Sequence, residues 1–320
     1  MGITHVPRPR APTSGSWSGA RPLDQLLEER GLVVTDVVAG AAPGTRRLYV
    51  ADVHDTDDVR FAVAVPHGDG GEGAVANEAT VLSLLHERLP AALSRSVPGV
   101  VEWVVGPAQR QSLVVTAVAG LDSSGTHPTN AGDLRRLLVD TITWLESVWQ
   151  STSGDLIPVE LGRGPVDLLL SRYRGAANVR PAIGALLRAR GRVAQVEVVS
   201  TATHGCLAPR HLHRSPDGEL GVDDWGLGST ASDPLRDLGR VAVDLASHHL
   251  PEVVVGRTAL ATEFRHAVCR GLEVLSVSPR LWRDVLLLAQ FEAALSELAR
   301  GEPSRLALLQ QSVHALPIRS

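Results

Sequence analysis

The stretch H-G-C-L-A-P-R-H at residues 204–211 decides the fold of this chain. It is followed by V-D-D-W at 222–225 and by D-P-L-R-D-L-G at 233–239. A polar loop, a short apolar strand, a carboxylate and the start of a helix therefore come in a fixed order. One of these pieces alone would be weak evidence, but their joint occurrence at this spacing is specific.

The chain contains no lysine, so all 31 residues of its Lys+Arg count are arginine. A GC-rich coding bias explains this composition on the surface. At an active site the absence of lysine has a consequence, because arginine cannot reproduce the compact point charge of lysine.

The bulk composition is that of a globular protein. The 320 residues suit one large domain or two modest lobes, and hydrophobic residues make up 44% of them. The net charge of −4 indicates no nucleic-acid partner. The two cysteines form no disulfide framework, and no apolar run near Met1 or elsewhere predicts a signal peptide or a membrane span. We expect a cytoplasmic protein.

The chain divides by its periodicity into a tail and two lobes. Residues 1–20, rich in Pro, Ser, Gly and Arg, predict a disordered tail, and residues 21–118 an N-terminal lobe. This lobe is expected to hold an antiparallel sheet of five strands with one helix inserted after the third. The strands are expected at Val33–Val38, Arg47–Val53, Val59–Val65, Val100–Val105 and Ser112–Val118, and helices at Leu23–Arg30 and Ala76–Arg88.

Residues 119–320 predict a mainly helical C-terminal lobe. Its helices are expected at Asp133–Trp149, Pro165–Tyr173, Arg180–Arg190, Asp233–His249, Gly256–Ser276, Pro279–Arg300 and Ser304–Ala315. Short strands are expected around the opening motif, at Gln195–Val199, Leu212–His213 and Leu220–Asp223. The whole is an α+β chain of two lobes.

From about Leu23 onward the chain resembles the aminoglycoside phosphotransferase/choline kinase-like family, which shares the protein-kinase fold. The family pattern reads roughly H-G-D-x-x-x-x-N, then I-D-W, then D-P-x-x-D-L-A, and the three stretches quoted above correspond to it in order. The resemblance implies a two-lobed kinase-like fold and phosphoryl transfer from ATP with Mg²⁺. That reaction requires phosphates to be held, metal ions to bridge them and an acceptor hydroxyl to be oriented.

The catalytic loop departs from the family at both of its polar catalytic positions. Cys206 stands where the resemblance places the hydroxyl-orienting Asp, and a thiol is a poor substitute for a carboxylate at neutral pH. His211 stands at the position of the metal-binding Asn, and imidazole suits zinc-like ions better than magnesium. His204, expected to brace the loop, is retained.

Two carboxylates of the family pattern remain. Asp224 corresponds to the metal-binding Asp, although a turn or capping carboxylate at the end of a strand is the alternative reading. Asp223 beside it is additional. Asp237 corresponds to a residue that accepts hydrogen bonds from the backbone of the catalytic loop, so it marks the fold more than the chemistry.

The position of the phosphate-binding lysine is occupied by Ala64, in F-A-V-A-V-P at 61–66. Glu78, at the position of the helix Glu that pairs with this lysine, is either buried or a solvated carboxylate without its usual partner. Arg46, Arg47 or Arg60 could substitute, although Arg60 lies four residues, about 13 Å of strand, from position 64.

The hinge between the lobes is expected at residues 116–120, where the backbone near Thr116 and Val118 could hold an adenine ring. ATP and Mg²⁺ are thus the implied cofactors, and a chain with these replacements could bind neither. Cys206, His211 and His213 also admit a zinc site or a Cys–His nucleophile. No metal-site spacing or oxyanion-hole pattern supports these readings.

Two hypotheses follow from this comparison. The first is a degenerate kinase, or pseudokinase, that acts by binding a small ligand or a protein partner. The second is an atypical phosphotransferase in which Asp224 holds magnesium, an Arg replaces the lysine, and Asp223 or a partner protein contacts the acceptor, a small hydroxylated metabolite or a peptide Ser/Thr. Arginine side chains paired to Asp224 and Glu78 would favour a scaffold.

Overall fold

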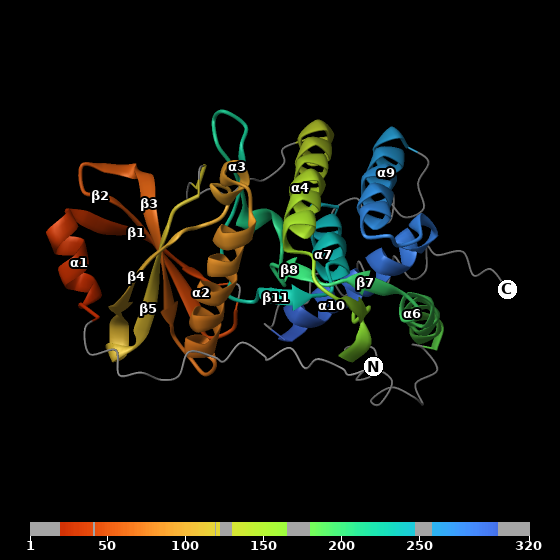
Figure 1. The fold of residues 1–320 in the computed structure, drawn as a ribbon, viewed down its shortest axis with the longest axis horizontal. Helices are drawn as coiled ribbons and strands as arrows, with labels where there is room; N and C mark the ends of the chain where they lie inside the picture. Colours follow the sequence, from red (N-terminus) through yellow and green to blue (C-terminus); the bar gives the residue numbers. More distant parts are fainter. Residues whose placement is uncertain are drawn as a thin grey trace, which may run out of the picture.

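The computed structural model describes residues 20–40, 42–118, 120–121, 130–164, 180–246 and 258–299. The predicted tail at 1–20 and the predicted helices Pro165–Tyr173 and Ser304–Ala315 lie outside these residues, apart from residue 20. The chain is α+β, with an antiparallel sheet in its N-terminal half and mainly helices in its C-terminal half (Figure 1).

The N-terminal lobe is built on a five-stranded antiparallel sheet of order β1-β2-β3-β5-β4, as predicted. The strands are β1 (Leu32–Ala39), β2 (Thr45–Asp52), β3 (Asp55–Pro66), β4 (Val100–Val105) and β5 (Gln111–Thr116). Helix α1 (Leu23–Arg30) packs on this sheet, with Leu23 and Leu26 buried. Its helical expectation is confirmed in full.

Helix α2 (Gly71–Arg88) lies between the sheet and the helical lobe (Figure 1). It begins five residues before the predicted Ala76, because Gly70, with φ of +78°, turns the chain directly into the helix. The short helix α3 (Ala91–Ser94) follows α2 and was not predicted.

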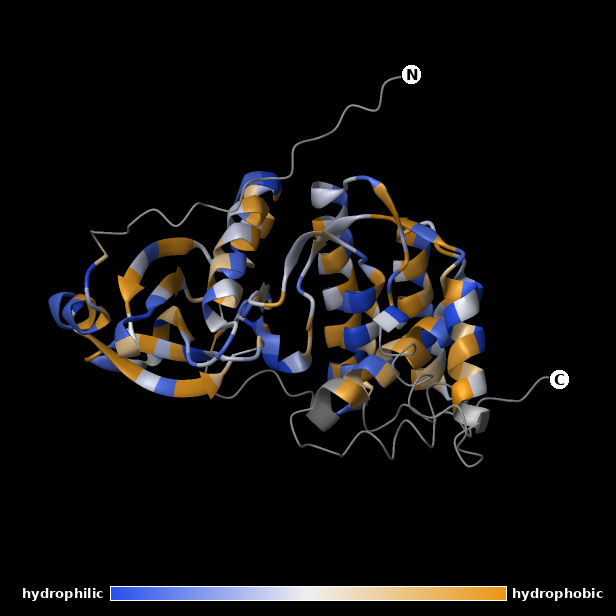
Figure 2. Ribbon diagram, turned by 90° about the horizontal axis from the view of Figure 1, so that it is seen from below, coloured by the Kyte–Doolittle hydropathy of each residue, from blue (hydrophilic) through white to orange (hydrophobic). Residues whose placement is uncertain are grey.

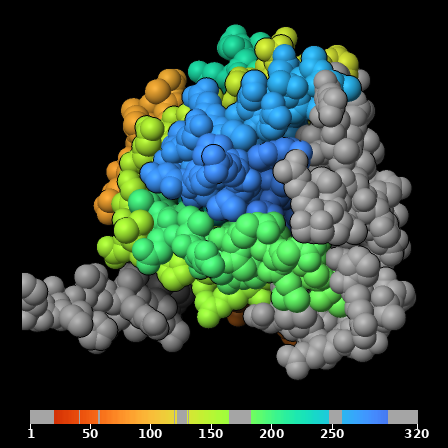
Figure 3. Space-filling view, turned by 90° about the vertical axis from the view of Figure 1, so that its right-hand side faces the viewer, coloured from red at the N-terminus to blue at the C-terminus, as the bar shows by residue number. Residues whose placement is uncertain are grey.

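The C-terminal lobe packs α4 (Ala131–Thr152), α7 (Leu235–Leu245), α9 (Ala259–Val274) and α10 (Trp282–Ala299) around one apolar core. Apolar residues recur on the inner faces of these helices, as Figure 2 shows in orange. Figure 3 views the face on which α6 (Arg180–Val193), α10 and α9 lie in succession, with Arg192 of α6 paired to Asp284 of α10 at 2.5 Å. No helix of the described residues has the length and apolar character needed to cross a membrane.

Three pairs of short strands arrange the residues around the opening motif. They are β9 (Leu212–Arg214) with β10 (Leu220–Val222), β8 (Thr201–Thr203) with β11 (Ser229–Ser232), and β6 (Leu156–Pro158) with β7 (Glu197–Val199). The sequence predicted β7, β9 and β10, whereas β6, β8 and β11 are too short to give a periodic signal. Together these strands place His204, at the end of β8, beside Asp223, just after β10.

Candidate functional site

The loop after β8 is held by the carboxylate of Asp237. His204 N–H donates to Asp237 Oδ2 at 2.5 Å, and Gly205 N–H donates to Oδ1 at 2.9 Å. Burial raises the pKa of Asp237 to about 6, although these two backbone donors lower it. Asp237 thus occupies the bracing position that the family resemblance implies for it.

His204 is fully buried and lies at the centre of the cluster. Its Nε2 lies 2.7 Å from the carbonyl oxygen of Asp223, and its Nδ1 accepts from Cys206 N–H at 3.4 Å. Burial, together with the neighbouring His211, lowers the pKa of His204 to about 3, so its ring is neutral. A neutral ring with Nε2–H as donor satisfies both contacts, so His204 holds the loop against the segment that carries Asp223.

The missing lysine has a substitute that the sequence named only as one of three candidates. Arg47 on β2 is 1% exposed, and its Nη2 lies 2.7 Å from Glu78 Oε1 and 2.9 Å from Asp224 Oδ1. Arg46 is exposed, and Arg60, also exposed, faces Asp52 and Asp58 instead. One arginine therefore bridges the helix carboxylate and the carboxylate at the metal position.

Arg47 reaches this place because of the strand register. Arg47 lies directly opposite Ala64 across the β2–β3 ladder. Directly opposite residues share one face of a sheet, with their Cβ atoms about 5 Å apart. The small side chain of Ala64 leaves space on that face, which Arg47 fills on its way to Glu78.

Glu78 is 1% exposed, so the reading of Glu78 as a solvated helix carboxylate is wrong. Its Oε1 accepts from Arg47 and, at 3.3 Å, from Trp225 N–H. Burial raises the pKa of Glu78 in spite of Arg47. Burial would also raise the pKa of Asp224, but Arg47 and His211 hold it below its ordinary value. Asp224 faces two cations, whereas Glu78 faces one.

Asp223, additional to the family pattern, is 2% exposed and takes part in the same cluster. Tyr49 of β2 donates its hydroxyl to Asp223 Oδ2 at 3.2 Å, and His213 Nε2 lies 3.2 Å from Oδ1. Contacts with His211 and His213 outweigh burial and hold the pKa of Asp223 well below its usual range. The sequence offered no signal for Tyr49, since its role depends on the packing of the two lobes.

The turn between β1 and β2 closes over Asp224. Ala42 in this turn is 2% exposed and packs against Gly226, where an added Cβ would come within 3.2 Å of the Ala42 methyl. The turn is fixed from behind, because Gly44 O accepts from His67 N–H at 2.6 Å and from Gly68 N–H at 3.0 Å. The resemblance implies nucleotide phosphates at this place.

The residues present do not fit a magnesium ion bound to nucleotide phosphates. Magnesium requires carboxylate oxygens in a nearly octahedral arrangement. Asp224 Oδ1 is held by the Arg47 cation, and Oδ2 lies 4.0 Å from Nδ1 of His211, whose pKa contacts with Asp223 and Cys206 raise to about 9 in spite of burial. A metal ion would have to displace a buried guanidinium from between two carboxylates.

The zinc reading finds no support in the described residues. No group of three or more His, Cys, Asp and Glu side chains is arranged there to hold a metal ion. The predicted hinge residues are placed at the end of β5. Thr116 is exposed and binds Gly99 through both its backbone N–H and its hydroxyl, whereas Val118 is buried. Their role toward an adenine ring stays a prediction.

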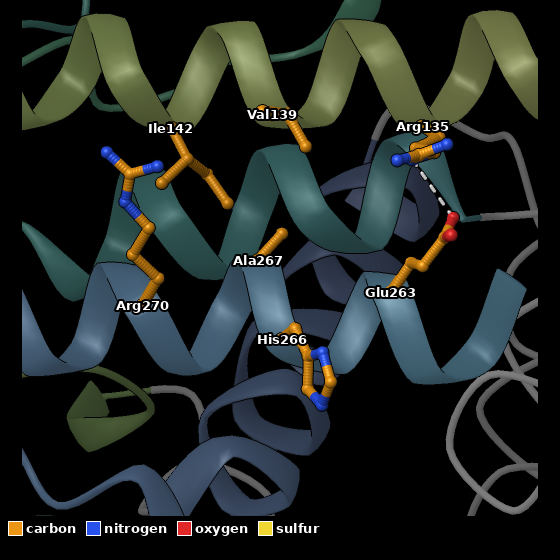
Figure 4. A pocket seen from close by; sticks show the side chains of 7 residues that line it. All are labelled: Arg135, Val139, Ile142, Glu263, His266, Ala267 and Arg270. Carbon is orange, nitrogen blue, oxygen red and sulfur yellow. Dashed lines mark ion pairs between the residues drawn. The ribbon is translucent and has the colours of Figure 1, made fainter. Parts of the chain in front are cut away.

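A separate groove of about 280 Å³ lies between α4 and α9, with Val139, Ile142 and Ala267 on its walls (Figure 4). Arg135 of α4 pairs with Glu263 of α9 at 3.0 Å at one end of it. The groove shares no lining residue with the cluster around Asp224.

Comparisons with known proteins give the fold its name. No family model and no curated protein matches the sequence. Solved structures do match. An apo aminoglycoside phosphotransferase APH(4)-Ia is 14% identical at a TM-score of 0.57, with 91% of this chain and 97% of that chain covered. Choline kinase LicA from Streptococcus pneumoniae gives 14%, 0.56, 91% and 97%, and a GDP complex of aminoglycoside 2'-phosphotransferase IIIa gives 15%, 0.56, 90% and 95%. This chain therefore has the protein-kinase-like fold of the aminoglycoside phosphotransferases and choline kinase.

Proposed function

We propose that this chain is a non-catalytic member of the kinase-like fold, a pseudokinase that acts by binding a small ligand or a protein partner. The observation that carries the proposal is the bridge from Arg47 to both Glu78 and Asp224. In a phosphotransferase these two acids serve a phosphate-holding cation and a metal ion. Here one side chain of the protein neutralises both.

The replaced loop residue supports the same reading. Cys206 presents no carboxylate to an acceptor hydroxyl, and Asp223, the alternative contact, is held by Tyr49 and His213. Loss of the orienting carboxylate and of the metal together would lower the rate by several powers of ten. The buried cluster instead joins the two lobes, since Arg47 and Tyr49 come from β2 and both Asp residues from the C-terminal half.

The test is ATP binding and turnover with and without Mg²⁺, followed by calorimetry and phosphate release. For wild type we expect neither magnesium-dependent binding nor turnover. Turnover by wild type that disappears in Asp224→Asn would refute the proposal. A ligand at 100 times its Kd stabilises a protein by about 2.7 kcal/mol, so thermal unfolding provides an independent readout.

A restored variant makes the test specific. Arg47→Ala, Ala64→Lys and Cys206→Asp together return the cation to β3 and the carboxylate to the loop. We expect this triple variant to gain magnesium–ATP binding. The matched control carries Arg46→Ala in place of Arg47→Ala, keeps the Arg47 bridge and is expected to gain none.

A second candidate function rests on Arg47 Nη1. This buried nitrogen has no hydrogen-bond partner within the described part of the chain. An atypical phosphotransferase could use it to hold a phosphate of ATP, with a small hydroxylated metabolite or a peptide Ser/Thr as acceptor. ADP and AMP-PNP occupy complexes of the similar APH(4)-Ia with hygromycin B. ATP binding by wild type that is lost in Arg47→Met, with turnover, would favour this candidate.

A further inference from the structure

The thiol of Cys206 is surrounded by cationic side chains from two elements. Arg210, on the 3-10 turn Pro209–His211, donates from Nη2 to the Cys206 sulfur at 3.8 Å. The side chain of His211, on the same turn, is hydrogen-bonded to the thiol, and the charge of Arg240 on α7 acts on it. The sulfur therefore meets three donors or charges at the place where the resemblance implies a carboxylate.

These neighbours favour the ionised form of the sulfur. Burial would raise the pKa of the Cys206 thiol, but His211, Arg240 and Arg210 together bring it below its ordinary value. His211 contributes as a cation, since contacts with Asp223 and Cys206 outweigh its burial and raise its pKa to about 9. A thiolate is the reactive form of cysteine, and adjacent cations are its usual cause.

The second cysteine provides an internal comparison. Cys269 on α9 is more exposed than Cys206, and both are free thiols. The Cys269 thiol donates to the carbonyl oxygen of Pro279 at 3.7 Å, and burial raises its pKa in spite of Arg265. Exposure alone predicts that Cys269 reacts faster, whereas the charge environment predicts the opposite order.

We propose that Cys206 is a modification site at which a small hydroperoxide oxidises this chain. The sulfur attacks one peroxide oxygen, an S–O bond forms and the O–O bond breaks. Sulfur is oxidised by two electrons to a sulfenic acid, and the peroxide is reduced. The protonated ring of His211 supplies the proton that converts the leaving hydroxide to water. The reaction requires no nucleotide, so it stands apart from the function proposed above.

The burial of Cys206 sets the size of the reagent. Its side chain is part of the core at 6% exposure, so a reagent of the size of hydrogen peroxide is favoured over a bulky electrophile. The bridge between Arg210 and the sulfur lies on the open side, because Arg210 is exposed whereas His211 is buried. Hydrogen peroxide is therefore the probe of choice.

The experiment treats the native full chain with substoichiometric hydrogen peroxide in the presence of dimedone, which traps sulfenic acids. Peptide mass spectrometry then compares labelling of Cys206 and Cys269. We expect Cys206 to be labelled about tenfold faster or more, since each unit of pKa below ambient changes the thiolate fraction up to tenfold. Equal labelling, faster labelling of Cys269, or labelling of Cys206 only in urea would overturn the proposal.

Charge variants identify the cause. His211→Gln should slow labelling of Cys206 about tenfold, and Arg210→Gln should slow it less, because each removes one cation beside the sulfur. Arg265→Gln, beside Cys269, is the matched control and should leave Cys206 unchanged. If His211→Gln does not fold, the exposed Arg210 still decides the matter. A folded Arg210→Gln chain with unchanged labelling across pH 6–9 would contradict the role of the cations.

Discussion

Replacement of Arg47 by methionine should be among the most destabilising single changes in the N-terminal lobe. Methionine keeps much of the length and apolar volume of the arginine but removes its charge. Glu78 and Asp224 would then be two carboxylates, 1% and 6% exposed, without the guanidinium that lies 2.7 and 2.9 Å from them. The change separates the electrostatic role of Arg47 from its packing.

The size of the effect follows from the burial of these groups. Removal of one partner from a buried ion pair costs about 3–5 kcal/mol, because the remaining charge stays desolvated. Protonation of Glu78, whose pKa burial already raises, limits the loss, and His211 still faces Asp224. We therefore expect a loss of about 4 kcal/mol from a total that is typically 5–15 kcal/mol.

Urea unfolding followed by tryptophan fluorescence measures this loss, with the buried Trp225 beside the cluster as a reporter. Arg46→Met is the matched control, since Arg46 is adjacent on the same strand and exposed. Surface substitutions usually change stability by less than about 0.5 kcal/mol. Only the variant at position 47 should show a large change in midpoint.

The pH dependence gives a second signature. Without Arg47 the folded-state pKa values of both acids rise above their unfolded values, so their contribution to stability is retained at low pH and lost as pH rises through the folded values. The difference between wild type and Arg47→Met should therefore shrink between pH 7 and pH 5. A loss below about 1 kcal/mol, or a difference independent of pH, would refute the charge argument.

Two further changes test the framework of the site. Asp237→Asn should lose about 1–3 kcal/mol at pH 7, because one of the two loop donors loses its acceptor; the folded pKa of Asp237, about 6, lies above its unfolded value, so wild type should gain on this variant as pH falls from 7 to 5 in urea titrations. Gly71→Ala should cost about 1–3 kcal/mol, since its Cβ would meet Gly44 O at 2.2 Å. Gly73→Ala, with open space around it in the same helix, should stabilise by up to about 1 kcal/mol in thermal unfolding, and equal effects of the two glycine changes would contradict this packing.

The sheet and the long helices were predictable, because they carry clear periodicity. The five strands of the N-terminal lobe and α4, α9 and α10 follow regular apolar spacing. Strands β6, β8 and β11 have three or four residues each, too few for an alternating pattern. Their pairing depends on tertiary contacts, as in Thr203 opposite Ser229.

The motif residues could be named from the sequence, but their partners could not. Tyr49 and Asp223 are 174 positions apart, and no local pattern indicates that they meet. Charge state was equally hidden. Glu78 on a helix reads as a solvated carboxylate until its burial is known, and His211 becomes a cation only through Asp223 and Cys206.

The choice among the three arginines shows why register limits sequence inference. Near its turn, the β2–β3 hairpin pairs Asp52 with Asp55, and this register continued without a shift would place Arg47 opposite Arg60. Irregularities at Val50, Ala51 and Asp52 shift the pairing so that Arg47 faces Ala64 instead. Extra residues of this kind are not encoded in periodicity, yet they decide which side chains share a face. Loss of the lysine and gain of the Arg47 bridge are thus one change in space: the cation moves one strand across the same face. On β2 it lies close enough to Asp224 to neutralise the carboxylate that a metal ion would need.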